Sequence, residues 1–196
     1  MFSRLTMGVL ALQGDFERHL FRLGSLNVNC REVRTNNDLD GLDALIIPGG
    51  ESTTMTELID RFGMRQRLTD FCRRKAVWGT CAGLIMLASK IDDERVRPLR
   101  IIDLDVIRNG YGRQIHSAYA EFEATFNGTP TILKASFIRA PIVRSYGPKV
   151  SVISTYHNNP VLLSSDKCLV SSFHTELHDD LTLTRFFLEK FVSGHK

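Results

Sequence analysis

Short apolar runs alternate with amphipathic segments along the first half of the chain. The runs at residues 7–12 and 44–47 are continuously apolar, which is typical of strands buried on both faces of a parallel sheet. The sequence predicts four strands here, at residues 7–12, 28–33, 44–47 and 77–80. Helices are predicted between them, at residues 15–24, 52–62, 65–74 and 82–88. Strands that alternate with helices indicate a mainly parallel sheet covered on both faces.

The pattern changes after residue 100, where short turn-bounded strands dominate. These strands are predicted at residues 102–107, 120–126, 131–137, 150–156, 161–163 and 169–173. Residues 181–192 form an amphipathic helix that closes the chain. We expect an α/β fold of three layers, flavodoxin-like, with a mixed, mainly parallel sheet and a short antiparallel extension. The length of 196 residues fits a single domain spanning residues 1–196.

Composition excludes several classes of protein. The formal net charge is only +3, and basic residues are interleaved with acidic ones, so we expect no nucleic-acid partner. No apolar run is long enough to span a bilayer, and we expect no membrane association. The four cysteines are far apart and form no CxxC pair, which disfavours disulfides and a structural zinc site. These features favour a cytoplasmic protein.

Cys81 lies in the strongest local motif, GTCAG, between a predicted strand and a predicted helix. This arrangement is typical of a nucleophile elbow, in which a sharp turn lifts the side chain to the carboxyl edge of the sheet. The adjacent helix N-terminus favours a thiolate. Cys30, Cys72 and Cys168 lack this context and are interpreted as small buried apolar residues.

A cysteine nucleophile needs a base, and His174 is the best candidate among six histidines. Residues two apart on an extended segment point to the same side, so Glu176 can orient His174. We interpret His19, with the other histidines that lack such a neighbour, as an ordinary surface or helix histidine. His174, Glu176 and His178 could instead be metal ligands, but their spacing is not the HExxH pattern, and we expect no metal.

The segment PGGEST follows another predicted strand and precedes a helix. The glycine pair Gly49 and Gly50 can offer backbone N–H groups to an oxyanion, and the N–H of Ala82 would be the second donor.

The chain resembles class-I (triad) glutamine amidotransferases, and within them the glutaminase subunits of pyridoxal 5′-phosphate synthase. The resemblance covers almost the whole chain. Its motifs are GVLALQGDFERH, IIPGGESTTM, WGTCAGLIMLA, RNGYGRQIHS, FIRAP and FHTEL. GTCAG and the His-x-Glu pair mark the wider class, whereas PGGEST, RNGYGRQ and FIRAP are specific to the narrower group.

The resemblance implies that Cys81 attacks the side-chain amide of glutamine and that His174 transfers the proton. A thioester forms and is hydrolysed to glutamate. It further implies that the ammonia passes to a separate (β/α)₈-barrel synthase subunit, which joins it to a pentose phosphate and glyceraldehyde 3-phosphate. No cofactor is expected in this chain.

By the same resemblance, six residues would contact L-glutamine: Gly50, Glu51, Ser52, Arg108, Ile138 and Arg139. An arginine can pair with the α-carboxylate of glutamine, and Glu51 with its α-ammonium group. Arg139 lies in an otherwise apolar stretch, where an unpaired guanidinium would be costly.

The chain departs from the family at Thr175, where proline is usual between the histidine and the glutamate. Threonine keeps an extended conformation, so we expect the triad to survive. Activity in this family usually depends on docking of the synthase. We therefore expect the isolated chain to have little activity, because the peptide between Gly49 and Gly50 is not yet turned toward the oxyanion.

Three alternatives remain open. The chain could serve another synthase, such as one that makes an imidazole or a tetrapyrrole amide. It could be a non-catalytic binding subunit with the same fold, although the complete triad argues against that. It could also be a cysteine protease or chaperone with a related elbow, which the PGGEST segment disfavours.

Overall fold

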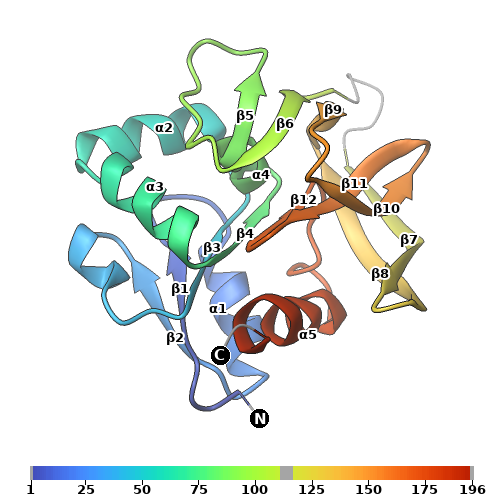
Figure 1. Cartoon of the computed structure of the whole chain (residues 1–196), viewed down its shortest axis with the longest axis horizontal. Helices are drawn as coiled ribbons and strands as arrows, with labels where there is room; N and C mark the ends of the chain where they lie inside the picture. The colour runs from blue at the N-terminus through green and yellow to red at the C-terminus, as the bar shows by residue number, and fades with distance from the viewer. Residues whose placement is uncertain (1, 111–116, 195–196) are drawn as a thin grey trace.

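A mainly parallel sheet forms the centre of the molecule (Figure 1). The structure is a computed structural model that describes residues 2–110 and 117–194. Within these residues the sheet has seven strands in the order β10-β11-β12-β4-β3-β1-β2. Their bounds are β1 Thr6–Leu10, β2 Asn29–Val33, β3 Ala44–Ile47, β4 Ala76–Thr80, β10 Ser151–Tyr156, β11 Asn159–Ser165 and β12 Cys168–Ser171. The five strands from β12 to β2 pair in parallel, and β10 and β11 form an antiparallel extension.

Helices cover both faces of this sheet, as the alternation of side chains along the strands requires. Val9 and Ile46 pack into one apolar cluster with α1 (Phe16–Gly24) and the C-terminal helix, whereas Leu45 and Ile47 pack into a second cluster on the other face. The C-terminal helix comprises α5 (Thr182–Phe187) and the π-helical turn η2 (Leu188–Ser193). The second cluster includes α2 (Ser52–Arg61), α3 (Arg65–Arg74) and α4 (Ala82–Leu87). The predicted three-layer α/β fold is confirmed.

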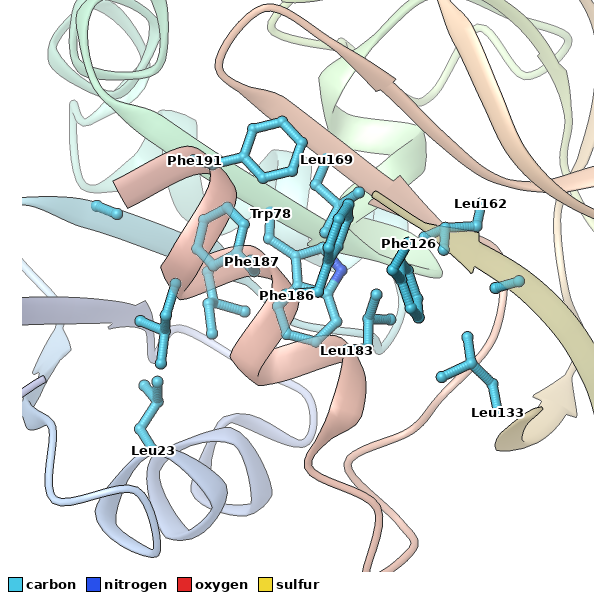
Figure 2. Packing of buried hydrophobic residues seen from close by; sticks show 14 of the residues in the cluster. Leu23, Trp78, Phe126, Leu133, Leu162, Leu169, Leu183, Phe186, Phe187 and Phe191 are labelled. Carbon is cyan, nitrogen blue, oxygen red and sulfur yellow. The ribbon is translucent and has the colours of Figure 1, made fainter. Parts of the chain in front are cut away.

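The C-terminal helix is held by an aromatic cluster around Trp78 (Figure 2). The ring of Trp78 lies 5.8 Å from that of Phe187, and Phe186 lies 4.3 Å from Phe126. Trp78 is 1% exposed and belongs to β4. Because β4 leads directly into Cys81, this packing fixes the strand that carries the predicted nucleophile.

Two smaller sheets stand beside the main one. One contains β5 (Ala88–Ile91), β6 (Ile102–Ile107) and β9 (Ile142–Tyr146), and the other is the hairpin of β7 (Ser117–Phe126) and β8 (Thr129–Ile138). We did not predict β5 and β9, nor the 3-10 helix η1 (Asn36–Leu39). β5 begins directly where α4 ends, so no turn residue separates the two elements. In the described part of the chain, no helix is long and apolar enough to cross a membrane.

Candidate active site

Cys81 lies at the junction between β4 and α4, at the carboxyl edge of the sheet. Its backbone angles are φ 50° and ψ −100°, which are strained for a residue with a side chain. The N–H of Cys81 donates to the carbonyl of Ser171 at 2.8 Å, so β12 helps to hold the turn. A side chain on Gly83 would overlap the carbonyl of Ile47. The tight strand-to-helix turn predicted from the sequence is therefore present.

His174 lies just after β12, and its backbone is fixed by the hairpin. Its N–H donates to the carbonyl of Ser136 at 2.8 Å, and its carbonyl accepts from the N–H of Ser136 at 3.0 Å. The Nδ1 atom lies 2.6 Å from Oε1 of Glu176, and Cys81 is near enough to the ring to raise the pKa of His174. Because Nδ1 is paired with the carboxylate, Nε2 is the nitrogen that can exchange a proton with the sulfur of Cys81. The structure thus brings the three predicted catalytic side chains together.

The protonation of His174 reflects opposed effects. Burial lowers the pKa of His174, but hydrogen bonds to Cys81 and Glu176 and the charges of both residues raise it, with a net rise to about 10. The imidazolium form is therefore favoured at neutral pH. A cationic ring beside a sulfur stabilises a thiolate, which is the nucleophilic form of cysteine.

Glu176 is 2% exposed and anchors the far side of the imidazole. Burial raises the pKa of Glu176, but the neighbouring His19 and the hydrogen bond from His174 outweigh that effect and lower it. Arg22 Nε also donates to the backbone carbonyl of Glu176 at 3.2 Å. An ionised carboxylate in this position keeps the hydrogen of the ring on Nδ1.

The loop after β3 lies against the imidazole of His174. A side chain on Gly49 would overlap Cε1 of His174, so glycine is needed for this close approach. The carbonyl of Gly49 accepts from the N–H of Asp15 at 3.4 Å, and Oε1 of Gln13 accepts from the N–H of Glu51 at 3.0 Å. The segment before α1 therefore holds the predicted oxyanion loop next to the triad.

Four other predicted residues lie at or next to the ends of helices and strands. Ala82 is the first residue of α4, so its N–H lacks an intrahelical acceptor. Ser52 begins α2, and its buried hydroxyl has no hydrogen-bond partner among residues 2–110 and 117–194. Ile138 ends β8, and its carbonyl lies 3.8 Å from Sγ of Cys81. Arg139 is exposed, so our argument that an unpaired guanidinium would be costly at this position was wrong.

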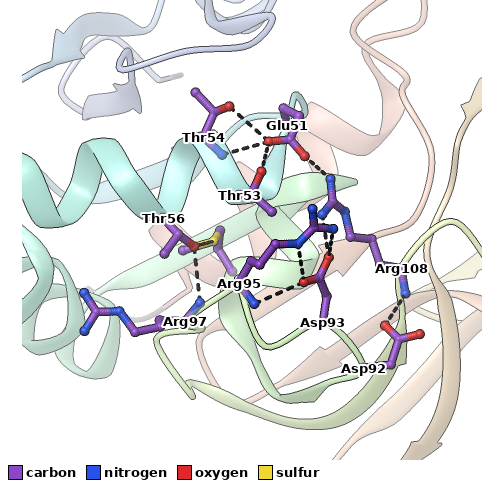
Figure 3. Close-up of polar contacts among 10 residues, drawn as sticks. Glu51, Thr53, Thr54, Thr56, Asp92, Asp93, Arg95, Arg97 and Arg108 are labelled. Atoms are coloured by element: carbon purple, nitrogen blue, oxygen red, sulfur yellow. Dashed lines mark hydrogen bonds and ion pairs between the residues drawn. The ribbon is translucent and has the colours of Figure 1, made fainter.

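Glu51 and Arg108, both predicted to hold glutamine, form an ion pair with each other (Figure 3). Glu51 also caps α2, because its carboxylate accepts from the N–H of Thr54 at 2.8 Å and from the hydroxyl of Thr53. Arg108 makes a second ion pair with Asp93 at 2.8 Å, and burial lowers its pKa. A cation and an anion thus lie side by side.

Comparisons with known proteins show the family of the chain. A profile of the SNO glutamine amidotransferase family matches residues 9–193. The chain belongs to this family. It is 42% identical over 186 residues to a protein of Fervidobacterium nodosum and 44% identical over 182 residues to one of Francisella tularensis, both called pyridoxal 5′-phosphate synthase subunit PdxT. These matches cover 94% and 93% of this chain, and 96% and 97% of the relatives.

Solved structures give the same result at the level of the fold. A crystal structure of a glutamine amidotransferase superposes with a TM-score of 0.85 at 41% identity, covering 93% of this chain and 97% of the other. A glutamine amidotransferase from Thermotoga maritima superposes with a TM-score of 0.61 at 12% identity, covering 97% of this chain and 83% of the other. The second similarity concerns the fold alone.

Thr175, the departure from the family pattern, is 1% exposed. The chain bends at Thr175, and the N–H of His178 donates to its carbonyl at 3.0 Å. The segment is therefore bent, whereas we expected it to be extended. The hydrogen bond between His174 and Glu176 is nevertheless present.

The rival metal site receives no support from side-chain geometry. Nε2 of His178 lies 2.9 Å from the hydroxyl of Ser136, whereas His174 faces Glu176 and Cys81. In the part of the chain that the structure describes, no three histidine, cysteine or acidic side chains converge as metal ligands do. Two histidines considered from the sequence, at positions 116 and 195, lie outside the described residues.

Sequence reasoning misjudged His19. We interpreted it as an ordinary surface or helix histidine, but it is 2% exposed and its Nε2 lies 3.6 Å from Oε1 of Glu176. Its spacing offered a signal, because Phe16 and Leu23 stand three residues before and four residues after it and share its face of α1. The hairpin bridge through Ser136 had no such signal, because only the tertiary fold joins that residue to His174.

Proposed function

We propose that this chain hydrolyses L-glutamine to L-glutamate and ammonia as the glutaminase subunit of a pyridoxal 5′-phosphate synthase. The observation that carries the proposal is the position of His174, whose Nδ1 hydrogen-bonds Glu176 and whose pKa is raised by the neighbouring Cys81. A nucleophile, a base and an orienting carboxylate in this order are the requirements of acyl transfer through a covalent intermediate. The names and the identity of the two relatives support the assignment to this synthase.

The first half of the reaction forms a thioester. The thiolate of Cys81 attacks the side-chain carbonyl carbon of glutamine, and negative charge develops on the carbonyl oxygen. The N–H groups of Gly50 and Ala82 stabilise this oxyanion. His174, which holds the proton of the thiol, delivers it to the amide nitrogen as the C–N bond breaks. Ammonia leaves, and the γ-glutamyl group stays on the sulfur.

The second half releases glutamate. His174 is now neutral and takes a proton from a water molecule, which attacks the thioester carbon. The oxyanion of this step again accepts hydrogen bonds from the N–H groups of Gly50 and Ala82. The C–S bond then breaks, and the sulfur leaves as a thiolate beside the imidazolium. Glu176 keeps the ring in one orientation through both halves.

The charged groups of glutamine would be held at the other end of the site. Arg108 and Arg139 supply cations for the α-carboxylate, and Glu51 supplies an anion for the α-ammonium group. Ser52 offers a buried hydroxyl that has no partner among the described residues, and Ile138 would contact the side chain of the substrate.

The ammonia acceptor in this proposal is a separate synthase subunit with a (β/α)₈-barrel fold. Residues 1–196 would act as a single glutamine amidotransferase domain without a cofactor of its own. The four cysteines are free thiols, and a reducing cytoplasm would keep the nucleophile in that form. We assign the protein to that compartment and propose no nucleic-acid or membrane partner.

Docking of the synthase would switch the site on. We place the docking surface at residues 12–16 and at the oxyanion loop. The N–H of Asp15 in the first segment holds the carbonyl of Gly49 in the second. We expect the purified chain to hydrolyse glutamine slowly until the synthase turns this peptide toward the oxyanion. Equal glutaminase rates with and without the synthase would contradict this part of the proposal.

The decisive experiment compares the wild type with Cys81→Ala, each with and without the barrel synthase. Glutamate release should be lost in the variant, while ammonium salts should still support formation of pyridoxal 5′-phosphate. Cys30→Ala is the matched control, because Cys30 is a half-buried free thiol on β2. Labelling by a chloro ketone analogue of glutamine should modify Cys81 only. Glutamine hydrolysis by Cys81→Ala would refute the assignment.

A further inference from the structure

A second histidine faces the catalytic carboxylate from helix α1. Nε2 of His19 lies 3.6 Å from Oε1 of Glu176, the same oxygen that pairs with His174. The side chains of His19 and Glu176 are 2% and 1% exposed. The ring of His19 also meets Trp78 edge-on, at 5.5 Å between centroids, so packing against the sheet fixes its orientation.

The two facing groups have complementary unused hydrogen-bonding atoms. Within residues 2–110 and 117–194, Nε2 of His19 and Oε2 of Glu176 are both buried without a hydrogen-bond partner. An unpaired buried donor or acceptor is costly. Because Nε2 is already within 3.6 Å of this carboxylate, a small shift of either side chain turns the ion-pair distance into a hydrogen bond.

The groups around His19 and Glu176 decide which of the two side chains carries a charge. His19 faces Glu176, His174 and Asp15, and Glu176 faces His19 and His174 while Arg22 binds its backbone carbonyl. Burial, the largest effect, lowers the pKa of His19, although the carboxylates of Glu176 and Asp15 oppose it. His19 is therefore a neutral ring at physiological pH, which can donate through Nε2 without adding charge.

We propose that His19 is a positioning residue for glutamine hydrolysis: its Nε2–H supports the carboxylate of Glu176, which in turn holds His174. His19 would then keep Glu176 ionised and aimed at Nδ1 of His174, without touching the substrate itself. The inference rests on the proposed roles of Cys81, His174 and Glu176.

The test compares two variants that separate packing from hydrogen bonding. His19→Phe keeps an aromatic ring against Trp78 but removes the N–H, whereas His19→Gln keeps an N–H donor at a similar reach. Leu23→Ala is the structural control, because Leu23 is a fully buried residue of α1 in the apolar cluster. All are assayed for glutaminase activity in complex with the synthase, from pH 5 to pH 10.

Loss of one hydrogen bond to a charged group should lower kcat of His19→Phe about tenfold, with KM unchanged. In the pH profile of kcat of this variant, the midpoint of the acidic side should rise by about one pH unit. The reason is that the carboxylate of Glu176 loses a stabilising hydrogen-bond donor. His19→Gln should recover most of both changes. Leu23→Ala should lower thermal stability but leave the pH profile in place.

A second measurement does not need the partner. The rate of Cys81 alkylation by iodoacetamide, followed against pH in the isolated chain, should fall at acidic pH in His19→Phe and stay near wild type in His19→Gln. If His19→Phe and Leu23→Ala behave alike in both assays, His19 only packs the helix and the inference is wrong. If Cys81→Ala still hydrolyses glutamine, the proposed function itself has failed.

Discussion

The two ends of the proposed glutamine site are held by different forces. At the reacting end, Cys81, His174 and Glu176 are all buried, and backbone hydrogen bonds to Ser171 and Ser136 fix the chain on either side of the sulfur. At the other end, Glu51 and Arg108 form an ion pair in which the side chain of Glu51 is 44% exposed. Bond-making atoms need a fixed geometry, whereas charged groups at the mouth of a site can exchange one partner for another.

This difference has an energetic basis. A charge–charge contact near water is weakened by solvent, so an exposed ion pair contributes little to stability and can be replaced by a substrate of similar charge. A buried carboxylate without its partner would cost several kcal/mol. Changes at the reacting end should therefore act mainly on kcat, and changes at the charged end mainly on KM.

The largest effect is expected for Glu176→Gln. The amide keeps the shape of the carboxylate but removes the charge that orients His174, so kcat should fall by up to roughly 10⁴-fold. KM should change little, because Glu176 does not face the substrate. Steady-state glutaminase assays of the assembled complex measure both values. A rise in KM with an unchanged kcat would contradict the prediction that the reacting end acts on kcat and the charged end on KM.

Gly49→Ala should come next. The added methyl group would overlap Cε1 of His174, and the ring cannot move away freely because Glu176 holds Nδ1. A displacement of about 1 Å in a catalytic group costs on the order of 10²-fold in rate. Circular dichroism should show an intact fold. Wild-type activity in this variant would mean that the loop moves away from His174 during catalysis.

A smaller effect, on KM, is expected for Arg108→Gln. Removing the cation at the charged end should raise KM for glutamine about tenfold, with kcat nearly unchanged. Arg97→Gln is the matched control, because Arg97 also forms an ion pair, with Asp60, but its side chain is 63% exposed and it is not among the residues proposed to contact glutamine. An equal rise in KM in both variants would indicate a nonspecific charge effect.

The smallest effect concerns pH and is best read by NMR titration of His174. Its pKa of about 10 should fall in Cys81→Ala and in Glu176→Gln, because each variant removes a group that raises it. The folded pKa lies above the unfolded value of about 6.5. Its contribution to stability is therefore complete below pH 6.5 and is lost as pH rises toward 10. Denaturation of the wild type and His174→Gln across this range should show that loss in the wild type only.

Much of the fold and of the triad was predictable because each depends on local patterns. The apolar runs that became β1 and β3 and the glycine-flanked Cys81 carry their signal within a few residues. The strands β5 and β9 were missed because short alternating segments acquire their pairing only when distant chain segments meet. Arg139 was misjudged for the same reason, since an apolar neighbourhood in sequence does not fix how far a long side chain reaches toward solvent.

The sequence by itself determined the parallel α/β core, the family and the identity of the predicted nucleophile, base and orienter. Only the tertiary structure decided what holds them: the bridge from Ser136 to His174, the support of Glu176 by α1 through His19 and Arg22, and the pairing of Glu51 with Arg108. The physical reason is distance along the chain. A turn or a strand encodes its own geometry locally, whereas these polar contacts form only when folding brings together groups that are far apart in the sequence.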